Sequence, residues 1–174
     1  MKLLEQVQIV PIMVGGVLDV RNQTRTGDYV SLKNWRNCTI VVHFADGTAN
    51  DDVRCALYQA TTVAGGSAKA LDALVTGRIY TKLGTADVTA VGTWTKETQA
   101  TADELYTHAA SGEQSGCYVL ELEATDLDVA NGFDCIRCDI IGIANNAAKL
   151  ACGEYILWNG RLLNDPEVML TAIA

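Results

Sequence analysis

The stretch Gly116–Asp165 reads GCYVLELEATDLDVANGFDCIRCDIIGIANNAAKLACGEYILWNGRLLND and decides the fold class of the chain. It contains three apolar runs, Cys117–Glu123, Phe133–Ile143 and Glu154–Leu162, separated by short breaks rich in Asp, Asn, Ala and Gly. Apolar and polar side chains alternate along each run, which is the period of a half-buried β-strand. Because short breaks favour antiparallel neighbours, we expect these three strands to form a meander.

Two earlier runs have the same character. Cys38–Phe44 and Val53–Gln59 are apolar and partly β-branched, and the pair Asp46-Gly47 lies between them. An Asp-Gly pair between two such runs favours a hairpin. No alternation of strands with helices is visible, so the sequence predicts an all-β fold, either an antiparallel β-sandwich or a jelly-roll-like double sheet.

The length of 174 residues suits one domain with a proper core. We expect residues 1–20 to form an extended N-terminal arm or a first strand, since Pro11 and the pair Gly15-Gly16 disfavour a helix there. Residues 21–174 then form the single β-sandwich domain. Within it, Gln99–Ser115 is either a short helix capped by Thr101 or an irregular excursion.

The charge balance excludes some partners. The chain carries a net charge of -8, which argues against binding nucleic acid or an anionic membrane by bulk electrostatics. The apolar start, Leu3–Val20, is interrupted by polar and acidic residues and lacks the order of a signal peptide. No apolar run reaches the roughly 20 residues that a membrane span needs. We therefore expect a protein made and kept in a cytosol.

The cysteines predict structure rather than chemistry. Six are present: Cys38, Cys55, Cys117, Cys135, Cys138 and Cys152. Without a secretory signal, we interpret them as buried free thiols in preference to disulfides or metal ligands. The Cys135 and Cys138 side chains would point to opposite sides of a strand, which disfavours a shared metal.

No catalytic motif is present in the sequence. Glu121 and Glu123 share one face of a predicted strand, and we interpret them as a solvated face rather than a glycosidase pair. Asp126, Asp128 and Asn131 could form a calcium site, but they fall in a predicted turn, where such residues usually cap the backbone. We expect no catalytic residue, no cofactor and no metal, and so no enzyme.

Three segments resemble virion proteins of tailed bacteriophages. They are GDYVSLKNWRNCTIVVHF at Gly27–Phe44, LYQATTVAGGSAKAL at Leu57–Leu71, and the closing strands in Tyr118–Pro166. In this order and spacing, they are similar to capsid decoration, cement or auxiliary head proteins. The resemblance implies a structural protein that decorates or cements the capsid and stabilises contacts between major capsid subunits. It implies no catalytic residue.

The same resemblance implies partners and a location. The partners would be the major capsid protein and further copies of this chain, as a trimer or dimer. The location would be the outer surface of the virion, after assembly in the cytoplasm of the bacterial host. An acidic surface agrees with an outward position, because packaged DNA inside the shell would repel it.

Apolar residues near the start of the chain are the candidate contacts to the capsid or to other subunits. An extended segment can add its backbone to a neighbour's sheet edge while burying its side chains. The candidate contact residues are Leu3, Leu4, Val7, Ile9, Ile12, Tyr29 and Trp35.

Two other classes of protein remain open. A head-tail connector or tail structural protein would also be rich in strands, but it should form rings. A carbohydrate-binding module is less favoured and would need an exposed aromatic platform. Tyr155 and Trp158 lie on opposite faces of the last predicted strand, so one of them should face away from the core.

Overall fold

The computed structural model describes residues 3–13, 17–84, 94–144 and 147–161. Strands dominate these residues, together with three short 3₁₀ helices, η1 (Leu3–Glu5), η2 (Ala124–Asp126) and η3 (Val129–Asn131). None of the helices in the described ranges is long and apolar enough to cross a membrane.

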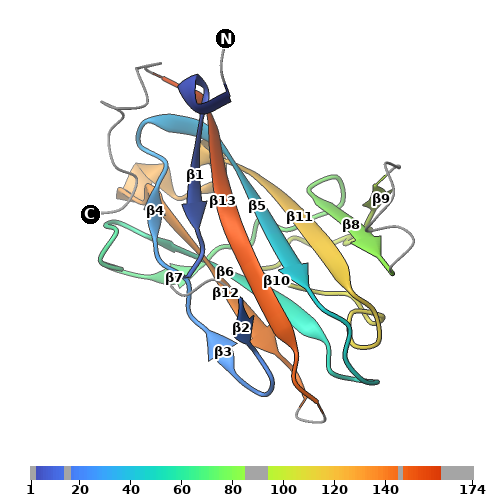
Figure 1. Cartoon of the computed structure of the whole chain (residues 1–174). Helices are drawn as coiled ribbons and strands as arrows, with labels where there is room; N and C mark the ends of the chain where they lie inside the picture. The colour runs from blue at the N-terminus through green and yellow to red at the C-terminus, as the bar shows by residue number, and fades with distance from the viewer. Residues whose placement is uncertain (1–2, 14–16, 85–93, 145–146, 162–174) are drawn as a thin grey trace.

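The strands form two antiparallel sheets (Figure 1). Sheet A has the order β1 (Val7–Pro11), β13 (Leu150–Gly160), β5 (Trp35–Phe44), β11 (Gly116–Glu123), β8 (Ile79–Leu83), β9 (Thr95–Lys96). The short strand β2 (Leu18–Asp19) also pairs with β13. Sheet B has the order β10 (Leu105–Thr107), β6 (Val53–Ala60), β12 (Cys135–Gly142), β3 (Thr24–Arg25), with β4 (Val30–Ser31) on β12 and β7 (Lys69–Ala70) on β6. The predicted all-β sandwich is confirmed.

The strand order is that of a jelly roll. Both β3 and β4 pair with β12, so they act as two parts of one broken strand. The principal strands in chain order are then β1, β3/β4, β5, β6, β10, β11, β12 and β13. One sheet places them first, eighth, third, sixth, and the other places them second, seventh, fourth, fifth. This is the order of a jelly-roll double sheet, and β8 and β9 extend sheet A beyond it.

Two predicted pairings are wrong. The strands β11, β12 and β13 form no meander, because the chain passes from sheet A to sheet B and back. The strands β5 and β6 form no hairpin, since β5 pairs with β11 and β13 while β6 pairs with β10 and β12. In both cases the short connection crosses from one sheet to the other. A period of two identifies a strand and its faces, but not the strand beside it.

The core lies between the two sheets and is closed by two tyrosines of sheet A. The hydroxyl of Tyr118 in β11 donates to the carbonyl of Val53 in β6 at 3.1 Å. The hydroxyl of Tyr155 in β13 accepts from the amide of Cys138 in β12 at 2.7 Å. Both rings are fully buried, so each hydroxyl must find a partner inside the core. These bonds cross the core and fix the two sheets against each other.

The start of the chain is tied to the sandwich. β1 pairs with β13 from Val7 opposite Trp158 to Pro11 opposite Glu154. The described part of residues 1–20 therefore contains a first strand and not a free arm. The Gln99–Ser115 segment contains β10 and no helix, and residues 162–174 of the expected domain lie outside the described part.

Candidate functional site

The candidate contact residues divide into two groups. Leu3 and Leu4 in η1 are exposed, as is Ile9 in β1, and Val7 is half-buried. Ile12, Tyr29 and Trp35 are buried in this chain. A buried side chain offers no surface to a partner, so the surface candidates narrow to Leu3, Leu4, Val7 and Ile9.

The burial of the other three has local causes. Ile12 packs against Gly153 of β13, where a Cβ atom would lie 2.6 Å from the Ile12 Cδ1. Trp35 begins β5 and is part of the main core. Tyr29 packs with Ala60 and Cys135 in a small cluster apart from the main core. The sequence pattern did not distinguish these positions from exposed ones.

β1 leaves one edge of sheet A open. Within the described ranges it pairs with β13 on one side only, and Figure 1 shows it as the outermost strand beside β13. Its sequence, VQIVP, contains no charged residue. Natural edge strands are usually protected against pairing by charged side chains, Pro, bulges or a covering segment, and of the protective residues β1 has only Pro11 at its end. An uncharged edge that carries the exposed Ile9 is therefore competent to accept another strand.

A shallow groove lies beside this edge on the outer face of sheet A. Residues opposite each other in antiparallel strands share a face, and one row across the sheet reads Val7, Trp158, Asn37, Glu123. Three adjoining hollows follow this row, with volumes of about 580, 390 and 660 Å³. Each pair of hollows has a lining residue in common, namely Asn37, Trp158 or Asn159, which makes the three one continuous groove.

Trp158 is the aromatic residue of the groove. It is 39% exposed, while Tyr155 on the other face of β13 is fully buried. The prediction that one of these two residues faces away from the core is confirmed. The indole Nε1 of Trp158 donates to Thr39 Oγ1 on β5 at 3.0 Å, which holds the ring across the two strands.

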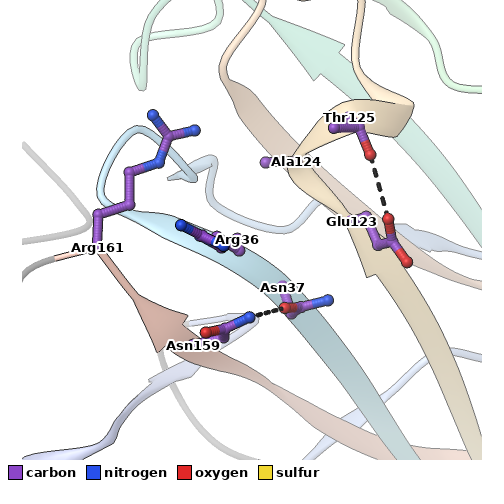
Figure 2. Close-up of a pocket in the computed structure, with 7 residues that line it drawn as sticks. All are labelled: Arg36, Asn37, Glu123, Ala124, Thr125, Asn159 and Arg161. Carbon is purple, nitrogen blue, oxygen red and sulfur yellow. Dashed lines mark hydrogen bonds between the residues drawn. The ribbon is translucent and has the colours of Figure 1, made fainter.

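Amides and charged groups surround the indole. Asn159 has a left-handed backbone, with a φ of 58°, and its side chain donates to Asn37 Oδ1 at 3.0 Å. Figure 2 shows Arg36 and Arg161 at one side of the hollow and Glu123, bonded to Thr125, at the other. Asn159 lies within β13, so the last residues of this strand line the groove.

Three charged groups of the groove have no partner among the residues that the structure describes. These are the guanidinium groups of Arg36 and Arg161 and the carboxylate of Glu121. In contrast, Arg78 at the groove's edge pairs with Asp126 Oδ2 at 2.6 Å. The groove therefore offers both hydrogen-bond donors and acceptors to a ligand.

The turn that follows β11 uses its acidic residues internally. Asp126 pairs with Arg78, and Asp128 pairs with Lys69 at 2.6 Å and accepts from Asn131. The bond from Lys69 lowers the pKa of Asp128. No cluster of three His, Cys, Asp or Glu side chains that could hold a metal occurs within the described ranges. These contacts favour the turn-capping interpretation of the three residues over the calcium site.

The thiols are structural in their surroundings. All six are free, and five are buried, which confirms the predicted burial except at the half-buried Cys152. Cys138 lies in the main core and Cys135 in the small cluster with Tyr29, on opposite faces of β12 as predicted. Burial raises the pKa of the Cys117 and Cys135 thiols to about 12, so both are protonated near neutral pH.

Sequence reasoning found part of the groove. It placed Glu121 and Glu123 on one face and one of Tyr155 and Trp158 outside. It missed Arg36 and Arg161, because nothing in the sequence brings the start of β5 beside the end of β13. The pairing of Trp35 with Gly160 is the contact that does so.

No protein-family model matches the chain, and no curated protein sequence matches it. Among solved structures, it is similar to the VP2 subviral particle of infectious bursal disease virus, with a TM-score of 0.26 and 8% identity. It is also similar to the structure of the Gx strain of that virus, with a TM-score of 0.26 and 12% identity. Each alignment covers 96% of this chain and 44% of the other, so this chain spans less than half the length of those chains. A TM-score this low carries no argument about function.

Proposed function

We propose that the protein is a non-enzymatic structural component of a virion that decorates or cements the head of a tailed bacteriophage. The observation that carries the proposal is the open, uncharged edge of β1 with the exposed Ile9, on a jelly-roll sandwich. Jelly rolls recur in viral capsid proteins, although lectins and cupins share them. The three phage-like segments of the sequence favour the viral class.

Strand addition gives this edge a physical role. A neighbouring capsid subunit that places a strand along β1 would gain main-chain hydrogen bonds and would bury Ile9, with Leu3 and Leu4 beside it. A protein that binds the assembled shell but not the free subunit stabilises the shell by mass action. The net charge of -8 supports a position outside the packaged DNA.

A substitution on the open edge tests the proposal. Ile9→Asp adds a charge to a side chain that is already 46% exposed, so the fold should survive while strand addition is opposed. We expect about a tenfold loss of affinity for undecorated, expanded phage capsids, measured by co-sedimentation. Deletion of Met1–Pro11 is less clean, because it also removes the buried Val10 and uncovers β13.

Val129→Asp is the matched control, since Val129 is 58% exposed and lies in η3, outside the two sheets. It should bind capsids like the wild type. If Ile9→Asp binds capsids as well as the wild type does, β1 is not part of the capsid contact. Recovery of the protein only in tail fractions of disrupted virions would move it to the connector or tail, and mass photometry would then show rings instead of trimers or dimers.

A further inference from the structure

The groove on the outer face of sheet A has the features of a ligand site separate from the β1 edge. Most of its lining residues come from β5, β11, β13 and the turns beside them, and Val7 of β1 lines one of the three hollows, while the capsid contact proposed above uses Ile9 and the free side of β1. The inference below does not rest on the proposed function.

Trp158 supplies a flat apolar surface in a polar groove. The indole is 39% exposed and lines two of the three hollows, so its ring is accessible to a ligand. The bond from its Nε1 to Thr39 satisfies the polar atom and restrains the ring before any ligand arrives. A restrained aromatic ring is suited to stacking against the apolar face of a pyranose.

The groups around the ring match hydroxyls. Asn37 and Asn159 are already paired with each other, which orients both amides toward the groove. The Glu121 carboxylate has no partner within the described ranges, while that of Glu123 accepts from Thr125 and from the backbone of Asp126. Carboxylates accept hydrogen bonds from sugar hydroxyls.

At the far end of the groove, Arg36 and Arg161 favour a ligand that carries a negative charge. Both guanidinium groups lie on the same side of the hollow in Figure 2, and neither has a partner in the described part of the chain. The chain has only 13 basic residues against 21 acidic ones, so two unpaired arginines that line one hollow are unexpected. Guanidinium groups bind carboxylates by two parallel hydrogen bonds.

We infer that this groove binds an acidic oligosaccharide. One pyranose stacks on Trp158, its hydroxyls bond to Asn37 and Glu121, and the carboxylate of a neighbouring sugar acid pairs with Arg36 and Arg161. The ligand class is therefore a polysaccharide that bears carboxylate groups, and such chains occur on cell surfaces.

An array of glycans that includes uronic and sialic acids, each beside a neutral counterpart, tests the inference. We expect binding to at least one carboxylate-bearing glycan, with affinity reduced about tenfold when its carboxylate is esterified. Trp158→Ala should lose that binding, and Arg36→Gln and Arg161→Gln should each weaken it about tenfold. Both arginine changes are at exposed positions and leave the fold intact, which keeps the test informative if Trp158→Ala is unstable.

Trp94→Ala is the matched control, because Trp94 is 43% exposed but lies at the β9 edge of sheet A under Lys82. It should bind like the wild type. The absence of binding to every carboxylate-bearing glycan would overturn the inference, as would equal losses in Trp94→Ala and Trp158→Ala. Capsid co-sedimentation by Trp158→Ala should stay at the wild-type level, so the two proposals fail independently.

Discussion

The outer faces of the two sheets differ in whether their arginines have partners within the fold. On sheet B, Arg137 lies between the rings of Tyr29 and Tyr58, at 4.9 and 4.5 Å from the ring centres. Its guanidinium also forms an ion pair with Asp139, in which Nη2 donates to Oδ2 at 3.0 Å and Nε lies 2.9 Å from Oδ1. This arginine has its partners within its own fold.

On sheet A, the arginines of the groove have no such partners. Arg36 and Arg161 are exposed, and neither pairs with any described residue. The carboxylate of Glu121 is equally free within the described ranges. A charge satisfied inside its own fold has little to gain from a ligand, whereas a free one has much. The free charges of sheet A are therefore available to a ligand, whereas Arg137 on sheet B is held by its own fold.

The largest effect should come from the inner faces, where the two sheets are alike. Leu120 of sheet A and Ile140 of sheet B are both fully buried. Leu120→Asp and Ile140→Asp each bury an unpaired charge, at a cost of several kcal/mol. We expect neither variant to give soluble protein, measured as yield after centrifugation.

Glu121→Gln serves as the control for the inner-face substitutions, since it changes the exposed neighbour of Leu120 and should express normally. Wild-type yield from Leu120→Asp would place that side chain on the surface and would break the assignment of faces in sheet A.

A pair of arginine substitutions sharpens the contrast between the outer faces. Arg137→Ala leaves the buried Asp139 without its partner and should lower the free energy of unfolding by about 3 kcal/mol. Arg36→Ala removes an exposed, unpaired group and should change it by less than about 0.5 kcal/mol. Urea denaturation with a common slope measures both. Equal losses of unfolding free energy in the two variants would contradict the difference in arginine pairing between the two outer faces.

The effect of Arg137→Ala should also depend on pH. Burial raises the pKa of Asp139 above its ordinary value of 3.8, and Arg137 opposes that rise. Without Arg137 the folded state holds the proton more tightly, so stability falls as pH rises from 3.8 through the raised pKa. The loss should therefore be smaller at about pH 4 than at about pH 7.

The smallest effect concerns the thiols, which lie on both sheets. Burial raises the pKa of Cys117 on sheet A and Cys135 on sheet B to about 12, and Cys152 is the least buried of the six. Ellman's reagent should react with about one thiol in the native protein and with all of them after denaturation. Cys152→Ser should abolish the native reaction. Rapid labelling of several thiols without denaturant would contradict the burial of the other five cysteines.

Local pattern predicted which side chains face inward. The alternation in β11 placed Leu120 inside and Glu121 outside, and in β13 it separated Tyr155 from Trp158, as the structure has them. This succeeds because the side-chain period of a strand is a property of the backbone itself. The predicted sandwich followed from the same alternation.

The groove could be predicted only in part, for the same reason. The sequence identified Glu121 and Trp158 as outward-facing residues of two strands. It did not show that the two side chains lie in the same groove. Both flank β5, which pairs with β11 on one side and β13 on the other. The same pairing sets Arg36 beside Arg161, which no spacing in the sequence indicates.

The sequence by itself determined the strands, their faces and the burial of most cysteines, because these depend on neighbours a few positions apart. Tertiary structure alone decided that β11, β12 and β13 alternate between sheets, and that β1 forms an edge instead of an arm. Both sheets must cover one core, and each inner face is completed by strands distant in the chain. Which distant strands pair is decided by the whole chain. The pairing of β13 with β1 and with β5 placed the β1 edge beside the groove of sheet A.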